Sequence, residues 1–272
     1  MKFTIIGASG FIGSNLVKYL KNQNFEVVSI TRNTSLESYK NVDCGNVIYC
    51  AGITSDFRTK PFETVEAHVC YLQKILQTLN FESFIYLSST RVYKSNSICS
   101  EEADIKVNSN NSDYIYNISK LMGESLCLTL PSKNIKVLRL SNVCGYNYNS
   151  EDFIYSLIKD ALINKKIILN STLNSSKDYI SIDDVVKLIT KIAIEGKEKI
   201  YNIASGININ NQEIIDILRL FMDFSVEIIE NAQEIIFPQI NVDKIKKEFN
   251  FHPENVLNTI ENIVNIRLKE SV

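Results

Sequence analysis

Glycine is scarce in this 272-residue chain, which contains only nine, and three of them fall within the first thirteen residues. Charge of one sign is also lacking: the formal net charge is −2, and there is no basic stripe of the kind that nucleic acid requires. No apolar run approaches the roughly 20 residues that cross a bilayer, and the strand-like FTIIG follows Met1 too closely for a signal peptide. We therefore expect a cytoplasmic protein with neither nucleic-acid nor membrane partners.

Clustered cysteine is a third absence. The six cysteines are widely spaced, with no CxxC and no grouping of Cys with His. Such spacing argues against a disulfide framework and against a zinc site. We expect reduced, mostly buried thiols and no metal.

Short apolar runs alternate with amphipathic stretches along the chain, a pattern typical of a parallel sheet covered by helices. The pattern predicts strands at 2–7, 25–32, 46–52, 83–90, 135–143, 199–206 and 224–230. It predicts helices at 11–23, 61–80, 116–124, 151–165, 211–222, 242–251 and 255–270, and a strand end running into a helix at 179–196. The expected fold is α/β, with a doubly wound parallel sheet.

The alternation becomes less regular after about residue 145. This predicts a dinucleotide-binding domain at 1–145, which also receives the strand and helix around 178–205, and a smaller substrate-binding lobe at 146–272. The segment between Asn33 and Asn46 is too short for a helix, a strand and a second helix. We therefore expect the outer edge of the sheet to be reduced.

The motif GASGFIG follows the first predicted strand and enters the first predicted helix. Its glycines remove steric barriers to a close turn, and a helix N-terminus favours an anion, so this context indicates a pyrophosphate site. The residues expected to bind a dinucleotide here are Gly7, Ser9, Gly10, Phe11, Ile12 and Gly13.

The end of the second strand bears on the choice of cofactor. A carboxylate there would favour NAD, but the chain has Thr31 and then Arg32. A guanidinium beside hydroxyls suits a 2′-phosphate, so NADP(H) is favoured over NAD(H); the alternative is an arginine at a solvent edge. Asp43, near the shortened segment, is a candidate contact for the adenine.

The stretch YNISKLMGE places Tyr116 and Lys120 one helical turn apart. A nearby ammonium is expected to lower the phenol pKa from about 10, which would allow proton transfer at a carbonyl oxygen. The preceding predicted strand ends in LSSTRVY and delivers Ser88, Ser89 and Thr90 to its carboxyl end, where α/β sheets bind ligands. Tyr155 and Lys159 have the same spacing, but no serine-bearing strand precedes them in the same way. We interpret them as part of an ordinary amphipathic helix.

Taken together, these motifs resemble the extended, nucleotide-sugar-modifying branch of the short-chain dehydrogenase/reductase superfamily, the NAD-dependent epimerase/dehydratase family. The resemblance covers nearly the whole chain. It implies that Ser89, Tyr116 and Lys120 are catalytic, with Lys120 also holding the nicotinamide ribose. It also implies cofactor contacts at the strand end Cys50, Ala51 and Gly52, a cofactor or substrate contact at Asn142, and a diphosphate contact at Lys177.

Departures from the family pattern narrow the expectation. The sugar 4,6-dehydratases that the chain resembles carry an Asp-Glu pair where this chain has Thr90 and Arg91, so dehydration is not expected. His68 stands where the family usually has Asn, and it is either a polar structural residue or a second acid/base. Ser88 and Thr90 are further candidates for substrate contacts.

The resemblance implies an oxidoreductase, of the kind used in polysaccharide biosynthesis, that reduces a 4-keto nucleotide-sugar with NADPH. A C4 epimerase with tightly bound cofactor is the alternative, and a non-catalytic NADP-sensing protein is a rival of another class. By analogy, the helices around His68 and Tyr116 would form a homodimer interface.

Overall fold

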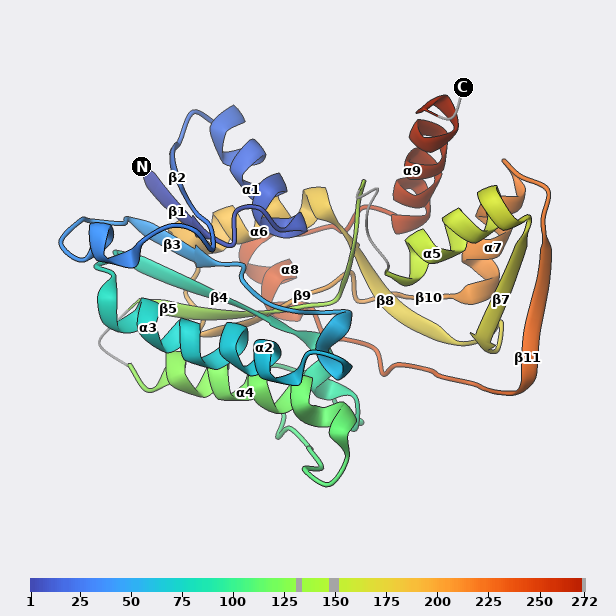
Figure 1. Ribbon diagram of the computed structural model, residues 1–272, viewed down its shortest axis with the longest axis horizontal. Coiled ribbons are helices and arrows are strands. Elements are labelled where there is room, and N and C mark those ends of the chain that lie inside the picture. Colours follow the sequence, from blue (N-terminus) through green and yellow to red (C-terminus); the bar gives the residue numbers. More distant parts are fainter. Residues whose placement is uncertain (131–133, 147–151, 271–272) are drawn as a thin grey trace.

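A six-stranded parallel sheet forms the centre of the larger lobe in the computed structural model, which describes residues 1–130, 134–146 and 152–270 (Figure 1). The strand order is β2-β1-β3-β4-β5-β9, and every neighbouring pair is parallel. The bounds are β1 Lys2–Ile6, β2 Glu26–Ile30, β3 Asn46–Tyr49, β4 Ser83–Ser89, β5 Ile135–Leu140 and β9 Ile200–Ile203.

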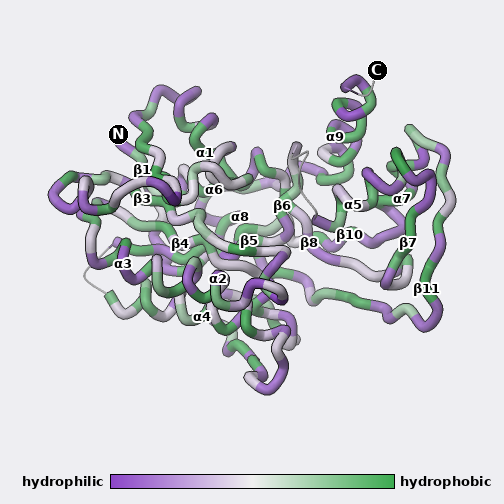
Figure 2. The backbone as a smooth tube through the Cα atoms, in the orientation of Figure 1, coloured by the Kyte–Doolittle hydropathy of each residue, from purple (hydrophilic) through white to green (hydrophobic). Residues whose placement is uncertain are grey.

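Helices cover both faces of this sheet, as Figure 1 shows. One face carries α1 (Phe11–Asn22), α6 (Ile182–Glu195) and α8 (Asp243–Phe249). The other carries α2 (Pro61–Val65), η3 (Glu66–Cys70), α3 (Tyr71–Thr78) and α4 (Ile115–Leu128). The alternation of β4 serves both layers: Ile85 and Leu87 join the core beneath α1 and α6, whereas Phe84 and Tyr86 join the core beneath α3 and α4. Figure 2 shows hydrophobic residues along the middle of the sheet. The expected doubly wound fold is confirmed.

The outer edge of the sheet is reduced, as the sequence predicts. Strand β2 is the edge strand, and between it and β3 the chain forms only the short helix η1 (Leu36–Tyr39). A single bridge between Asp43 and Asn80 follows before β3 begins.

The helix expected at 61–80 is interrupted by a π-helical turn, η3, at Glu66–Cys70. Such an insertion widens the turn, and π-bulges are often found at functional sites. Here it carries His68, whose side chain is fully buried.

The smaller lobe contains two short sheets (Figure 1). One has the order β10-β8-β6, and the other pairs β11 with β7 in parallel. Their bounds are β6 Asn142–Cys144, β7 Lys166–Ser171, β8 Ser176–Ser181, β10 Asn208–Asn210 and β11 Ser225–Gln233. The lobe's helices are α5 Phe153–Lys159, η6 Asp160–Asn164, α7 Asn211–Arg219 and α9 Val256–Glu270.

Strand β7 is absent from the sequence prediction. Lys165 separates it from η6 with a φ of 50°, a left-handed conformation that ends the preceding helix. The helix α6 begins at an N-cap, where Ser181 Oγ accepts from the Asp184 N–H at 3.0 Å, and it leads into β9 in the large sheet. The boundary near residue 145 stays a prediction.

None of the helices in the described ranges is long and apolar enough to cross a membrane. All six cysteines are free in the structure, and four of them, Cys44, Cys99, Cys127 and Cys144, are buried.

Candidate active site

The glycine motif forms a tight loop between the carboxyl end of β1 and the start of α1. Gly7 has a φ of +81°, and its N–H donates to Ile30 O at 2.9 Å. A Cβ on Gly13 would lie 2.3 Å from Gly7 O, so only glycine fits there. Gly10 is the N-cap of α1, and no described side chain caps the helix. The loop therefore presents backbone N–H groups and a positive helix end, which suits a pyrophosphate.

The end of β3 joins this loop to the helix that carries Tyr116 and Lys120. A Cβ on Gly7 would lie 2.8 Å from Ala51 N. A Cβ on Gly52 would lie 3.1 Å from His68 Nε2 and 3.4 Å from Lys120 Nζ. The strand end at 50–52 thus lies between the glycine loop, where the cofactor is expected, and the helix that carries Tyr116 and Lys120.

Tyr116 lies on α4, with only 5% of its surface exposed. Its hydroxyl is hydrogen-bonded to the Ser89 hydroxyl at the end of β4. The rings of Phe57 and His68 pack against the Tyr116 ring, each with its centroid 5.3 Å away. The sequence carries no local sign of this role for Phe57, which lies in the short helix η2 (Asp56–Arg58).

The direction of the Tyr116 pKa corrects the sequence expectation. Burial raises the pKa of the phenol, while the hydrogen bond from Ser89 and the charge of Arg91 act to lower it. Lys120 Nζ donates instead to Leu87 O at 2.9 Å and lies 5.9 Å from the centroid of the Tyr116 ring. Loss of water contact outweighs the neighbouring charges, so Tyr116 is protonated at neutral pH.

Lys120 is itself buried, with 5% of its surface exposed. Burial lowers the pKa of its ammonium to about 8, against the opposing charges of Glu124 and Cys50. The lysine therefore holds its proton only weakly in this setting, a perturbation that is common at active sites.

Both ring nitrogens of His68 have partners inside the protein. Nε2 accepts from the Ile53 N–H at 3.3 Å, and Nδ1 lies 2.9 Å from Ser119 Oγ. Ser119 Oγ also donates to Tyr116 O, so we assign the proton of the ring to Nδ1. Burial, followed by the charge of Lys120, lowers the pKa of His68 to about 2. These features favour the structural reading of His68: a neutral residue that fixes the helix beside Tyr116.

Ser88 points away from Tyr116, because successive residues of a strand face opposite ways. Its hydroxyl donates to Glu124 Oε1 at 2.5 Å. Glu124 also accepts from Arg139, with Nη2 to Oε2 at 2.7 Å, and both side chains are buried. The structure thus sets Ser89, rather than Ser88, beside the phenol.

Thr31 and Arg32 follow the carboxyl end of β2, next to the glycine loop, and Arg32 is exposed. Asp43 is at the opposite end of the strands, before β3 and bridged to Asn80 before β4. It precedes β3, its backbone O accepts from Lys2 Nζ at 2.8 Å, and its carboxylate accepts from Gly45 N–H. The expected adenine contact at Asp43 is therefore wrong, because the shortened segment returns the chain to the amino ends of the strands.

The remaining predicted residues lie around the start of the smaller lobe. Asn142 Nδ2 donates to Asp178 O at 2.8 Å, which links β6 to β8. Lys177 Nζ lies 5.4 Å from the centroid of the Phe153 ring. Burial, followed by the charge of Arg91, lowers the pKa of Lys177, so the two cations are near neighbours. Thr90 is buried at the start of η4 (Thr90–Tyr93).

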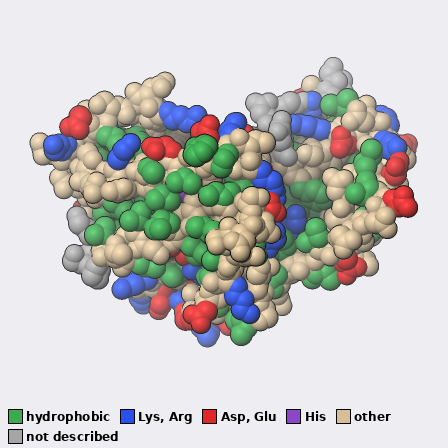
Figure 3. Space-filling model, turned by 60° about the horizontal axis from the view of Figure 1, so that its bottom comes forward, with side chains coloured by type: hydrophobic (Ala, Val, Ile, Leu, Met, Phe, Trp, Pro, Cys, Tyr) green, Lys and Arg blue, Asp and Glu red, His purple; other side chains and the backbone are tan. Residues whose placement is uncertain are grey.

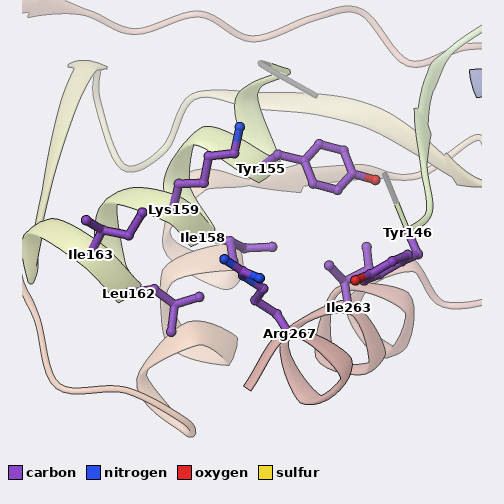
Figure 4. A pocket seen from close by; sticks show the side chains of 8 residues that line it. All are labelled: Tyr146, Tyr155, Ile158, Lys159, Leu162, Ile163, Ile263 and Arg267. Atoms are coloured by element: carbon purple, nitrogen blue, oxygen red, sulfur yellow. The ribbon is translucent and has the colours of Figure 1, made fainter. Parts of the chain in front are cut away.

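The second pair at the same spacing has a different setting. Tyr155 and Lys159 lie on α5 in the smaller lobe, and the Tyr155 hydroxyl accepts from Gly145 N–H at 3.0 Å. They line a cavity between α5 and α9 that also includes Arg267 (Figure 4). Its volume of about 30 Å³ admits a few water molecules at most, so a nucleotide-sugar does not fit there. Figure 3 shows a hollow between the two lobes, with Lys and Arg side chains along it.

Comparison with known proteins agrees with this arrangement. Residues 3–204 match the NAD dependent epimerase/dehydratase family. The chain belongs to this family.

Individual relatives are distant. The dTDP-D-glucose 4,6-dehydratase of Dictyostelium discoideum is 24% identical over 83% of this chain and 62% of that protein. The dTDP-4-dehydro-6-deoxyglucose reductase of Escherichia coli is 26% identical over 72% of this chain and 64% of that protein. The chain thus spans less than two thirds of the length of both relatives. The structure of MoeE5 in complex with UDP-glucose and NAD has a TM-score of 0.85 at 18% identity, with complete coverage of both chains, and shows a shared fold.

Proposed function

We propose that this protein is an NAD(P)-dependent oxidoreductase that reduces a 4-keto nucleotide-sugar. The observation that carries the proposal is the meeting of Tyr116, Ser89 and Lys120 at one edge of the sheet. The names of the relatives, a reductase among them, support the substrate class.

The glycine loop fits a dinucleotide. A Cβ on Gly13 would lie 2.3 Å from Gly7 O, so only glycine allows the close turn whose backbone can approach a pyrophosphate. The loop and the start of α1 would hold the pyrophosphate, and the strand end at 50–52 with Lys120 would border the nicotinamide and its ribose. When bound, the nicotinamide cofactor supplies the hydride that the carbonyl carbon receives.

The protein's own residues handle the oxygen of the carbonyl. Ser89 donates a hydrogen bond that polarises it, and Tyr116 transfers its phenolic proton to it as the carbon gains hydride. The raised pKa of Tyr116 keeps this proton in place at neutral pH. Lys120, whose ammonium is 5.9 Å from the ring centroid, stabilises the phenolate left behind until a proton returns from solvent.

Replacement of Tyr116 by Phe tests this proposal. We expect kcat to fall by about 10²- to 10⁴-fold, because the general acid is removed. The matched control is Tyr155→Phe, at the same Tyr-x-x-x-Lys spacing on α5, which should retain kcat. Full activity of Tyr116→Phe would refute the role of Tyr116 as general acid. Binding of NADP(H) by the unaltered protein without turnover of any 4-keto nucleotide-sugar would favour a non-catalytic NADP sensor.

A C4 epimerase is the second candidate, because the same three residues support removal and return of a hydride. A reductase consumes NADPH stoichiometrically with product. An epimerase retains its cofactor and turns over without added NADPH.

The preference for NADP(H) rests on Arg32, which is exposed beside the glycine loop. Arg32→Ala should weaken NADP(H) by about tenfold or more and leave NAD(H) nearly unchanged, as measured by calorimetry. Tighter binding of NAD than NADP by the unaltered protein would contradict this preference.

A homodimer through α2, α3 and α4 also remains a proposal. These helices lie together on one face in Figure 1, and Phe62 and Met122 expose 86% and 50% of their surface. Sedimentation of the protein and of Phe62→Glu would test it, since a charge at this interface should shift a dimer toward monomer.

A further inference from the structure

A buried ion pair lies beside the proposed site and has no part in the proton transfer itself. Glu124 is on α4, about two turns after Tyr116, and Arg139 is on β5. The guanidinium donates to both carboxylate oxygens, with Nη2 to Oε2 at 2.7 Å and Nε to Oε1 at 3.1 Å. Such a pair contributes less to stability than its contacts imply, because burial strips water from both charges. Its further contacts bear on the position of Ser89.

The carboxyl end of β4 is bonded to α4 by two buried hydrogen bonds, which together form the β4 clamp. In the first bond, Leu87 O accepts from Lys120 Nζ at 2.9 Å. In the second, Ser88 Oγ donates to Glu124 Oε1 at 2.5 Å. Lys120 and Glu124 are one helical turn apart, so successive strand residues are bonded to successive turns of the helix.

Ser89 follows directly after the β4 clamp. Its hydroxyl is hydrogen-bonded to that of Tyr116, which lies one turn before Lys120 on α4. The clamp therefore joins the same strand and the same helix that supply the two hydroxyls. Because the two residues before Ser89 are held against α4, the strand end has little freedom to move its hydroxyl away from the phenol.

Arg139 holds the other end of the segment that contains Ser89. Its Nη1 donates to the Tyr93 hydroxyl at 2.7 Å, and Tyr93 is the last residue of η4. The same hydroxyl donates to Asn202 Oδ1 at 2.9 Å. The sheet register places Ser88, Arg139 and Asn202 side by side on β4, β5 and β9. The segment at 88–93 is therefore held at both ends by one network anchored in the sheet.

We propose that Ser88, Glu124 and Arg139 are positioning residues, which hold the two hydroxyls of the site at the separation that proton transfer requires. The inference rests on the proposed function, in which the hydroxyls of Ser89 and Tyr116 act on the carbonyl oxygen of the substrate. A general acid must lie about 2.6–3.2 Å from the oxygen that it protonates. A misplacement of about 1 Å can cost about a hundredfold in rate.

Ser88→Ala is the first test, because it removes the bond to Glu124 and leaves the buried charges paired. The tyrosines of the full chain are labelled with ¹³C at Cζ, and the Tyr116 resonance is assigned by its absence in Tyr116→Phe. In Ser88→Ala this resonance should shift, because the hydrogen bond between Ser89 and the phenol is altered. The value of kcat per folded molecule should fall by about 10- to 100-fold.

Ser83→Ala is the matched control. Ser83 is also on β4, with 3% of its surface exposed against 5% for Ser88. Its hydroxyl donates to Asn46 Oδ1 at 2.6 Å, at the amino ends of β3 and β4, far along the strand from Ser89. The loss of this bond should lower stability by a similar amount, and it should leave both the Tyr116 resonance and kcat unchanged.

A double variant tests the ion pair. Glu124→Leu/Arg139→Met removes both charges at once, and with them the acceptor of the Ser88 hydroxyl and the donor to Tyr93. It should shift the Tyr116 resonance and lower kcat at least as much as Ser88→Ala does, when both are measured at a temperature where the proteins are folded.

Three results would each overturn the proposal. The first is a Tyr116 resonance in Ser88→Ala that coincides with that of the unaltered protein, and the second is an equal change in Ser83→Ala. The third is an unchanged resonance in the double variant. Failure of the proposed function is distinguishable, since the resonance is measured without substrate. Absence of turnover by the unaltered protein would refute that function whatever the resonance shows.

Discussion

The buried pair of Glu124 and Arg139 yields a prediction about stability that can be worked from the structure. The guanidinium makes contacts of 2.7, 3.1 and 3.2 Å to the carboxylate, and the two side chains expose only 4% and 5% of their surface. Burial acts to lower the pKa of Arg139, yet the hydrogen bonds and charge of Glu124 raise it overall. Ser88 adds a third donor to the same carboxylate.

Removal of one partner leaves the other charge buried and unpaired. We expect Glu124→Gln to lower the free energy of unfolding by about 3–5 kcal/mol, a large part of the total for a typical domain. For a protein of this size the loss corresponds to a fall in Tm of about 6–20 °C. Arg139→Met should cost a similar amount, whereas the double variant Glu124→Leu/Arg139→Met should cost much less than the sum.

The assay is urea unfolding followed by far-ultraviolet circular dichroism, because the chain has no tryptophan for fluorescence. The pair Arg58 and Asp113 is a matched control, with the same shortest contact of 2.7 Å but side-chain exposures of 56% and 34%. Its loss should cost about 1 kcal/mol or less. If the double variant at 124 and 139 loses the sum of the single variants, the two charges are not coupled and the reasoning fails.

Two further predictions concern the glycine loop and Lys120. Gly13→Ala should lower the free energy of unfolding by about 1–3 kcal/mol, because its Cβ would lie 2.3 Å from Gly7 O. A Cβ on Gly10 would lie 3.4 Å from the same atom, so Gly10→Ala should cost less. Equal urea midpoints for the two variants would contradict this prediction. The folded-state pKa of Lys120, about 8, is below its unfolded value of about 10.4, so the unfolded state binds more protons between these values and the contribution of Lys120 to stability rises with pH across that window. The stability of the protein relative to Lys120→Met should accordingly increase by up to about 3 kcal/mol from pH 7.5 to 10.5 in parallel urea titrations, and a difference that is flat with pH would exclude a lowered pKa.

The amino-acid sequence was enough to predict the fold class, the position of the glycine loop, and Tyr116, Lys120 and Ser89 as candidate catalytic residues. These depend on local rules: a glycine spacing between a strand and a helix, a separation of one helical turn, and the end of a strand. The shortened edge of the sheet could be predicted for the same reason, since a segment from Asn33 to Asn46 cannot hold three elements.

Other properties depend on burial and on partners distant in the chain, and no sequence pattern predicts them. Packing of Phe57 and His68 around Tyr116 raises the phenol pKa, where sequence spacing alone suggested a fall. His68 is neutral because its ring nitrogens meet Ile53 and Ser119, which no local pattern encodes. The same holds for Arg91, whose guanidinium lies 5.0 Å from the centroid of Phe57, because folding alone brings these two segments together.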